Sequence, residues 1–256
     1  MHNTKAVFIT VRSDSSRLPE KAYRKILGRP VIEMVMLRAK LVKMADLVVV
    51  CTTERCIDDR VVKIAQNVGV KYFRGSLEDK LDRWYGAVKK FNIDIFATFD
   101  GDDLLCAPEL IDSGLLQMDE ESIDFLKSPA ELAIGAFTYC IRASALAKVC
   151  AIKDTSDTEM MWTYFEDTGL FKVGELEVDE VYCNPKVRLT LDYQEDFDFF
   201  EKVFKHFNNT KNNVSLKEVL KYLEEHPKIT EINADRQKEW KQNQIEKTKL
   251  ILKKMN

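Results

Sequence analysis

The sequence predicts an α/β fold built around a mostly parallel, doubly wound sheet. Over the first hundred residues, short apolar runs rich in β-branched side chains alternate with segments whose apolar residues recur at helical spacing. The connections between them are short, as expected when each helix returns the chain to the same sheet by a right-handed crossover. With 256 residues, 45% of them hydrophobic, the chain can cover both faces of such a sheet.

The first strand is predicted over residues 5–11, a short apolar run of mainly β-branched side chains. Pro30 is expected to open a helix whose apolar positions include Val31 and Val35. Residues 47–51 predict a second strand, because an uninterrupted apolar run is typical of a parallel strand covered on both faces. The helix after this strand is expected to end at Gly69.

A third strand is predicted over residues 70–73 and a fourth over residues 93–99, with a helix between them that carries Leu81 and Trp84 on one face. In parallel sheets, ligands lie beyond the carboxyl ends of the strands. Polar residues cluster in the loops after the first and the fourth strand. The sequence therefore places the candidate site at these two loops.

The pattern changes from about residue 122. We interpret residues 122–180 as insertion elements within a single domain that spans residues 1–256, and residues 208–256 as a helical C-terminal extension. The strands expected in this half cover residues 134–142, 170–178 and 187–191. The helices expected there cover residues 143–150, 158–166, 196–207, 216–225 and 236–254.

Composition excludes several classes of function. The formal net charge of −3 argues against general binding to nucleic acid or to an anionic membrane, both of which need a basic surface. The N-terminal apolar run, residues 6–11, is too short for a signal peptide or a membrane span. The six cysteines are scattered without paired spacing, which indicates free thiols in a reducing compartment. We expect a cytoplasmic protein.

The loop after the first strand carries three cations among hydroxyl groups, contributed by Arg12, Ser13, Ser16, Arg17 and Lys21. It lacks the glycines of a P-loop or of a dinucleotide fingerprint. A guanidinium can hold phosphate oxygens through two hydrogen bonds, and an ammonium adds a mobile point charge. We interpret this loop as a polyphosphate-binding element. The alternative is a surface loop with solvated basic residues.

Acidic residues follow the fourth strand, where Asp100, Asp102 and Asp103 lie within four positions. Carboxylates this close repel one another unless a cation offsets their charge, and Mg²⁺ typically binds one or two carboxylates together with substrate phosphate. Asp192 ends the strand expected over residues 187–191, so it can stand opposite Asp102 and complete a metal site. The alternatives are the acidic start of a helix for Asp102 and Asp103, and a helix cap for Asp192.

These motifs resemble the cytidylyltransferases of the spore-coat polysaccharide biosynthesis type, which are relatives of the CMP-Kdo and CMP-acylneuraminate synthetases. The similarity runs from the first strand to about residue 233 and is weakest between residues 120 and 180. The matching residues are Arg12-x-x-x-Ser16-Arg17-Leu18-Pro19-x-Lys21, Leu27-Gly28-x-Pro30, Arg74-Gly75-Ser76, Leu81-Asp82-Arg83, Gly101-Asp102, and Arg188-Leu189-Thr190-Leu191-Asp192 followed by Glu195-Asp196-Phe197.

The resemblance implies a GT-A-like, Rossmann-like fold of the nucleotide-diphospho-sugar transferase type and transfer of CMP from CTP to a sugar or sugar-like acid. It implies Mg²⁺ as cofactor, a place in surface polysaccharide or glycan biosynthesis, and a homodimer formed through the insertion. Arg12, Arg17, Lys21 and Asp102 are then expected to be catalytic, and Asp102 and Asp192 to bind the metal. The nucleotide is expected to contact Arg12, Ser13, Ser16, Arg17, Lys21, Ser76, Asp82 and Arg83.

Three departures from the family pattern bear on the acceptor more than on the nucleotide. Glu20 stands where the family usually has glycine, Asp103 follows Gly101-Asp102 where a proline is usual, and Tyr139-Cys140 occupies a stretch that often carries an acidic residue. Two rival functions stay open. Asp100-Gly101-Asp102 could be the metal-binding motif of a glycosyltransferase that uses a nucleotide sugar, and the departures could mark a non-catalytic nucleotide-binding module.

Overall fold

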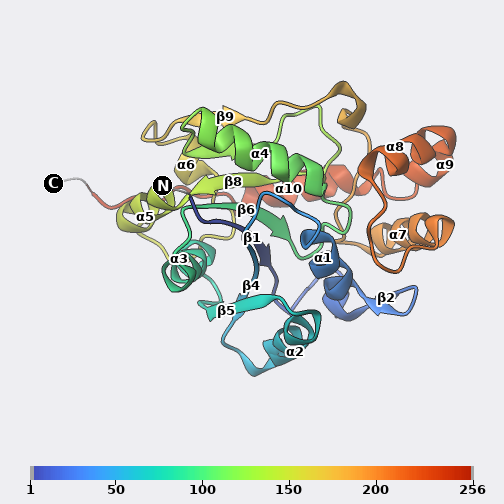
Figure 1. The fold of residues 1–256 in the computed structure, drawn as a ribbon, viewed down its shortest axis with the longest axis horizontal. Helices are drawn as coiled ribbons and strands as arrows, with labels where there is room; N and C mark the ends of the chain where they lie inside the picture. Colours follow the sequence, from blue (N-terminus) through green and yellow to red (C-terminus); the bar gives the residue numbers. More distant parts are fainter. Residues whose placement is uncertain (1–2, 255–256) are drawn as a thin grey trace.

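The computed structural model describes residues 3–254, and these contain a seven-stranded sheet with the strand order β5-β4-β1-β6-β8-β7-β9 (Figure 1). Strands β5, β4, β1 and β6 are parallel, whereas β8 runs antiparallel to both β6 and β7. The predicted fold class, a mostly parallel α/β sheet with flanking helices, is confirmed. The strands of this sheet are β1 (Lys5–Thr10), β4 (Leu47–Thr53), β5 (Lys71–Gly75), β6 (Ile95–Asp100), β7 (Phe125–Lys127), β8 (Tyr139–Arg142) and β9 (Val173–Glu175).

Helices cover both faces of the sheet because neighbouring residues of β1 point to opposite sides. Val7 and Ile9 belong to an apolar cluster that includes residues of α1, α2 and α4, whereas Ala6 and Phe8 belong to a second cluster with residues of α3, α5 and α6. The helices are α1 (Val31–Ala39), α2 (Asp59–Val68), α3 (Lys80–Phe91), α4 (Pro108–Glu120), α5 (Ala143–Ile152) and α6 (Thr163–Glu166).

The carboxyl ends of β1 and β6 lie in close contact. Thr10 pairs with Asp100 in the sheet, and Gly101 donates its backbone N–H to the Thr10 carbonyl at 2.9 Å. A Cβ atom at Gly101 would lie 2.8 Å from the Cβ of Val11, so only glycine fits here. The two loops that carry the predicted site residues therefore begin side by side.

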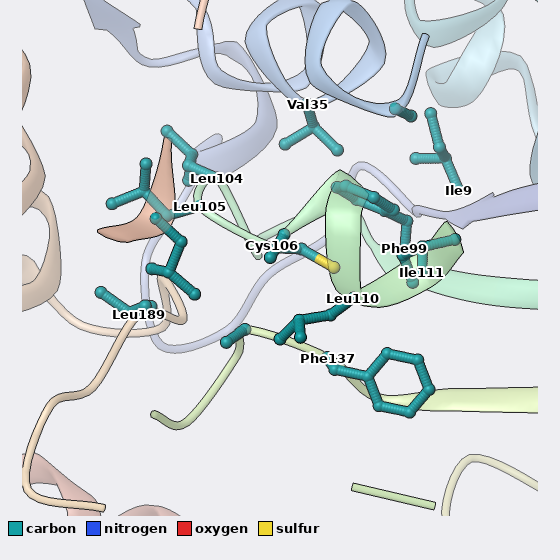
Figure 2. Close-up of a cluster of buried hydrophobic side chains, with 14 of the residues drawn as sticks. Ile9, Val35, Phe99, Leu104, Leu105, Cys106, Leu110, Ile111, Phe137 and Leu189 are labelled. Carbon is teal, nitrogen blue, oxygen red and sulfur yellow. The ribbon is translucent and has the colours of Figure 1, made fainter. Parts of the chain in front are cut away.

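The chain after Asp103 turns into the core. Leu104, Leu105 and Cys106 are fully buried, and Figure 2 shows them among Val35 and Leu189. Burial of large apolar side chains stabilises a fold by about 1.5–3 kcal/mol each. These buried residues directly follow the loop that carries Asp100, Asp102 and Asp103. They therefore anchor that loop and fix the position of Asp102.

The segment at residues 122–180 contributes β7, β8 and β9 to the central sheet. β8 and β9 are shorter than predicted, and β7 was not predicted. The strand expected over residues 187–191 is absent from the described chain, which shows only an isolated bridge between Arg188 and Ile134 there. Gly135, which follows Ile134, adopts a φ of 84°. The segment that would pair with residues 187–191 is therefore not extended, and the β-ladder cannot continue beyond this bridge. Leu191 instead donates its backbone N–H to the Asp102 carbonyl at 3.0 Å, which still brings Asp192 to the acidic loop.

The C-terminal helices are α7 (Gln194–Phe207), α8 (Leu216–Glu225), α9 (Pro227–Thr230) and α10 (Arg236–Lys247). In Figure 1, α7, α8 and α9 gather at one end of the molecule, whereas α10 lies nearer its middle. The predicted last helix is too long, because residues 248–254 are not helical and Leu252 bridges to Lys153. The outermost residues of the predicted domain and extension lie outside the described residues. Within residues 3–254, no helix is long and apolar enough to cross a membrane.

Candidate active site

The loop after β1 is held in shape from inside the protein. Ser13 donates its backbone N–H to the buried carboxylate of Asp58 at 2.7 Å, and its hydroxyl lies 2.5 Å from that of Tyr23. Asp58 ends the short 3₁₀ helix η2 (Cys56–Asp58) that follows β4. Ser13 therefore shapes the loop with both of its polar groups, whereas Ser16 lies exposed farther along it.

Glu20 adopts the left-handed conformation, with φ 56° and ψ 21°, just before the 3₁₀ helix η1 (Lys21–Tyr23). Glycine accepts this conformation at no steric cost, which gives a physical reason for a glycine at this position. The carboxylate of Glu20 is well exposed and lies 3.5 Å from Arg60. Its charge is thus directed to the surface, away from Lys21.

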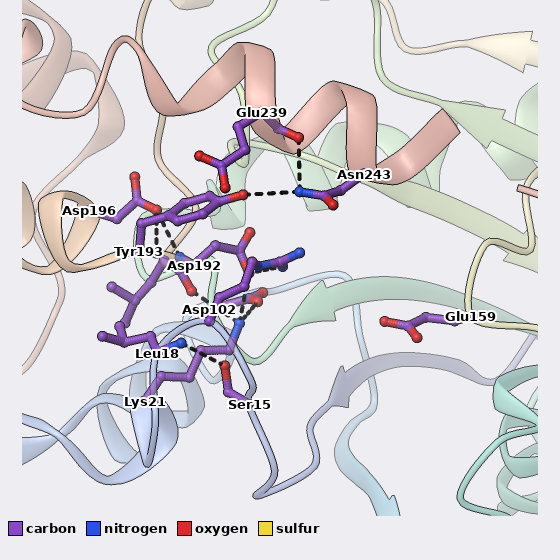
Figure 3. A network of polar contacts seen from close by, with 12 residues as sticks. Ser15, Leu18, Lys21, Asp102, Glu159, Asp192, Tyr193, Asp196, Glu239 and Asn243 are labelled. Atoms are coloured by element: carbon purple, nitrogen blue, oxygen red, sulfur yellow. Dashed lines mark hydrogen bonds and ion pairs between the residues drawn. The ribbon is translucent and has the colours of Figure 1, made fainter. Parts of the chain in front are cut away.

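Lys21 joins the two loops electrostatically. Its ammonium contacts the Asp102 carboxylate, lies 3.1 Å from Oδ1 of Asp192, and donates to the Leu191 carbonyl at 3.1 Å. Arg17 contacts the same Oδ1 of Asp192. We call Arg17, Lys21, Asp102 and Asp192 the Lys21 cluster. Figure 3 shows Lys21 reaching from its loop toward Asp102 and Asp192.

The pKa values of the cluster reflect burial and mutual attraction. Burial alone would lower the pKa of Lys21, but Asp102 and Asp192 raise it by more, so the ammonium stays charged. Burial would raise the pKa of Asp192, but Lys21 and Arg17 lower it well below its usual range. For Asp102, burial and the charge of Asp192 outweigh Lys21 and leave its pKa above the ordinary value. A further cation would therefore stabilise the charged form of Asp102.

The carboxylates of Asp102 and Asp192 fit a Mg²⁺ ion in part. Both contact one ammonium group, so their oxygens converge on a single position for a positive charge. Within the described residues, no group of three or more histidine, cysteine or acidic side chains is arranged to hold a metal. Two carboxylates are what Mg²⁺ commonly takes when water and substrate phosphate complete its shell. The arrangement therefore suits a metal that arrives with a phosphate ligand.

Arg12 points away from the Lys21 cluster. Its guanidinium donates to Glu159 at 3.1 Å, and Glu159 lies apart from the cluster in Figure 3. Arg12 lines a cavity of about 350 Å³. Besides Arg12, this Arg12 cavity is lined by Asp14, Leu77, Glu78, Asp157, Glu159, Glu246, Lys247 and Lys249.

The predicted residues around α3 lie near the Arg12 cavity. Arg83 is buried and donates to the carbonyl groups of Ser76 and Leu77. Burial, with a contribution from the positive charge of Arg12, lowers the pKa of Arg83. Asp82 is exposed in the first turn of α3. The structure thus brings Arg17 and Lys21 together with the two aspartates, whereas Arg12 lines the separate cavity.

Arg188 and Asp196 belong to the sequence motif around Asp192 and are functional candidates that the sequence reasoning missed, since both side chains contact Asp192 or its backbone. Arg188 contacts Asp192 at 3.3 Å and Asp196 at 2.9 Å, and Asp196 also accepts the backbone N–H groups of Asp192 and Tyr193. The signal was available: an arginine inside an apolar run must find carboxylates if it is buried, and aspartates follow four and eight residues later.

Comparisons with known proteins agree with the geometry. The cytidylyltransferase family matches residues 6–251. An uncharacterized protein of Methanocaldococcus jannaschii is 32% identical over 237 residues, which cover 91% of this chain and 96% of that protein. The spore coat polysaccharide biosynthesis protein SpsF of Bacillus subtilis is 26% identical, over 89% of this chain and 97% of its own. The structure of a cytidylyltransferase from Leptospira borgpetersenii superposes with a TM-score of 0.81 at 28% identity, covering 90% of this chain and 97% of that one.

Proposed function

Because this chain belongs to the cytidylyltransferase family, we propose that it transfers CMP from CTP to a hydroxyl group of a sugar or sugar-like acid and releases pyrophosphate. The observation that carries this proposal is the Lys21 cluster, in which two cations of the β1 loop meet two carboxylates at the carboxyl edge of the sheet. A triphosphate needs such cations, and a divalent ion that accompanies it needs such carboxylates.

The proposed reaction is an in-line displacement. An acceptor oxygen forms a bond to the α-phosphorus while the bond from that phosphorus to the bridging oxygen of pyrophosphate breaks. Arg17 and Lys21 stabilise the negative charge that grows on the departing pyrophosphate. The proton of the acceptor hydroxyl passes to water or to a nearby carboxylate such as Asp100, which ends β6. Positioning and charge neutralisation carry the reaction, without a covalent enzyme intermediate.

Asp102 and Asp192 are the proposed ligands of Mg²⁺, which would neutralise phosphate charge and lower the pKa of the acceptor hydroxyl when bound. In the structure, Lys21 neutralises these two carboxylates. In the proposed cycle its ammonium moves from them to the triphosphate, so the site keeps a compensating cation in both states. Removing Lys21 would leave the two carboxylates without this cation in the empty protein.

The Arg12 cavity is the proposed place for the part of the substrates beyond the triphosphate. It adjoins Arg83 and the start of α3, both predicted to lie near the nucleotide. Arg12 is paired with Glu159 here, so it must exchange this partner to reach a phosphate. The predicted roles of Ser13, Ser16, Ser76 and Asp82 stay predictions.

We place the reaction in surface polysaccharide or glycan biosynthesis, because the relative SpsF is named for spore coat polysaccharide biosynthesis. A cytoplasmic location is supported by the six cysteines, all of which are free. A homodimer stays part of the proposal, with the predicted contact within residues 130–180.

A pyrophosphate-release assay tests this function. The protein is incubated with each of four nucleoside triphosphates, with and without Mg²⁺, against sugar acids, neutral sugars, polyols and phosphonates. We expect acceptor-dependent pyrophosphate release with CTP only, and little without Mg²⁺. A blank without acceptor controls for hydrolysis of CTP. Release of a nucleoside diphosphate from a nucleotide sugar would favour a glycosyltransferase. Tight CTP binding without turnover on any acceptor would favour a non-catalytic module.

A further inference from the structure

Arg188 is a fully buried cation that contacts three side chains. It is 1% exposed, and its guanidinium donates to Asp196 at 2.9 Å and 3.2 Å, to Asp192 at 3.3 Å and to Gln237 at 2.9 Å. A buried guanidinium costs free energy unless its N–H groups are hydrogen-bonded to carboxylates or other acceptors. Here all three of its nitrogens have such a partner, so the group is held in one orientation.

The two oxygens of the Asp192 carboxylate have different partners. Oδ2 faces the buried Arg188, whereas Oδ1 faces Lys21 and Arg17 on the loop after β1. Because Arg188 holds one oxygen from behind, the carboxylate cannot rotate freely about its last bond. It presents Oδ1 to whatever cation lies in the Lys21 cluster.

Asp196 holds the backbone of the segment that carries Asp192. Its carboxylate is fully buried and accepts the backbone N–H groups of Asp192 at 2.8 Å and Tyr193 at 2.9 Å. It also accepts from the side chain of Asn233 at 2.9 Å. Asp196 therefore fixes the backbone of Asp192 and the guanidinium of Arg188 together.

The helix α10 completes this arrangement although it lies far along the chain. Gln237 accepts a hydrogen bond from Arg188, and the guanidinium lies 5.6 Å from the ring centre of Trp240. Asn243 on the same helix donates to the Tyr193 hydroxyl at 3.3 Å, as Figure 3 shows. Tyr193 in turn lies 5.5 Å from the guanidinium of Arg17. One face of α10 thus contacts groups that touch two members of the Lys21 cluster.

We propose that Arg188 is a positioning residue for Asp192 and that α10, through Gln237 and Trp240, holds Arg188 in place. This inference rests on the proposed function, because it assigns to Asp192 the task of receiving a cation together with CTP. The C-terminal helix then belongs to the site without touching substrate. Partners of this kind commonly change ligand affinity although they make no direct contact with the ligand.

Calorimetric titration with CTP and Mg²⁺ tests the proposal on the full chain. We expect Gln237→Ala and Trp240→Ala to weaken CTP binding by about tenfold, the size of effect seen for groups that orient a metal ligand. Gln242→Ala is the matched control, since Gln242 is exposed on α10 and bonds only to Glu246 of the same helix. Arg188→Lys keeps the positive charge but loses the planar set of guanidinium N–H donors. It should therefore retain part of the CTP affinity that Arg188→Met loses.

A double-mutant cycle separates positioning from general damage to the fold. Asp192→Asn removes the charge that Arg188, held by Gln237, is proposed to orient, so adding Gln237→Ala to it should change CTP affinity less than twofold. Additive losses would show that Gln237 acts elsewhere and would overturn the inference. So would Gln237→Ala and Trp240→Ala proteins that bind CTP as Gln242→Ala does. A wild-type protein that binds no CTP would overturn the proposed function first, and the inference with it.

Discussion

Arg17 is the residue at which a functional and a purely structural role separate most clearly. Its guanidinium contacts Asp192, yet its side chain stays 30% exposed. It can therefore turn to a phosphate without breaking a packed core. A solvated surface arginine would have no such carboxylate partner at the sheet edge.

Arg17→Ala should weaken CTP binding by roughly 1.5–3 kcal/mol, the usual size of a hydrogen bond to a charged group. That free energy corresponds to a loss on the order of ten- to a hundredfold in affinity. Arg17→Lys should recover only part of it, because an ammonium cannot form the two parallel hydrogen bonds of a guanidinium. Calorimetric titration of CTP measures both variants.

Arg24→Ala is a suitable control for Arg17, because Arg24 lies on the same stretch of chain but bonds to Gln194 and stacks near Phe197. We expect it to bind CTP as the unchanged protein does. Equal affinities in Arg17→Ala and Arg24→Ala would remove the phosphate-binding role of Arg17.

Asp102→Asn should abolish turnover and leave the melting temperature without Mg²⁺ almost unchanged. Burial raises the pKa of Asp102, so the folded protein tolerates a neutral side chain of the same shape there, and Lys21 keeps its contact with Asp192. Pyrophosphate release with Mg²⁺ and thermal denaturation without it are the two measurements. Full activity of the variant in Mg²⁺ would refute the assignment of Asp102 as a metal ligand.

At the scale of secondary-structure elements, β1 is held at its beginning as well as at its carboxyl end. Lys5 is buried, and its ammonium lies 2.5 Å from the carboxylate of Asp119 in α4, which also accepts from Asn3 at 2.8 Å. This ion pair ties the first strand to the helix that follows the acidic loop. It lies at the opposite end of the strand from the Lys21 cluster.

Asp119→Asn should lower the free energy of unfolding by about 1–3 kcal/mol at neutral pH, because it leaves a buried ammonium without its counter-charge. Burial would raise the pKa of Asp119, but the hydrogen bonds from Lys5 and Asn3 lower it below the ordinary 3.8. A lowered pKa contributes stability above 3.8 that disappears as the pH falls through the folded value. The difference between variant and unchanged protein should therefore shrink on acidification. Urea denaturation across this pH range measures it, with the exposed Glu120→Gln as control.

Elements with a strong local signal could be predicted from the sequence, as could a contact that follows from sheet topology, whereas contacts that depend on side-chain geometry could not. β1, β4 and β6 lie within two residues of the predicted bounds, because uninterrupted apolar runs are buried wherever they occur. The meeting of Asp102 and Asp192 followed from the rule that strand ends share one edge of a sheet, even though Asp192 arrives on an irregular segment.

The interior of the site depended on side-chain geometry that no local pattern encodes. Arg12 and Arg17 were both expected to hold the triphosphate, but Ser13, which lies between them in the loop, is anchored to Asp58. Arg12 then reaches Glu159, which lies 147 residues further along the chain. Neutralisation of the two aspartates by Lys21 likewise depends on the path of the whole loop.

At the scale of the whole molecule, the sheet has an exposed edge at β9. This strand pairs with β7 on one side, and Val173 within it is 36% exposed. Leu170 just before it is 43% exposed, and Val181 after it is 45% exposed. An edge strand beside apolar side chains is a favourable surface for pairing with a second chain, which is consistent with the homodimer predicted for residues 130–180.

Light scattering at micromolar concentration should therefore give twice the 29.6 kDa mass of one chain. Val173→Lys should shift the mass to that of a single chain, because a charged side chain on an edge strand opposes pairing and Val173 already faces solvent in the lone chain. Ile57→Lys is the matched control, since Ile57 is 56% exposed but belongs to η2, beside the loop after β1. It should leave the mass unchanged. A mass of 29.6 kDa for the unchanged protein would contradict the dimer altogether, whereas a dimer that survives Val173→Lys would place the contact on another surface.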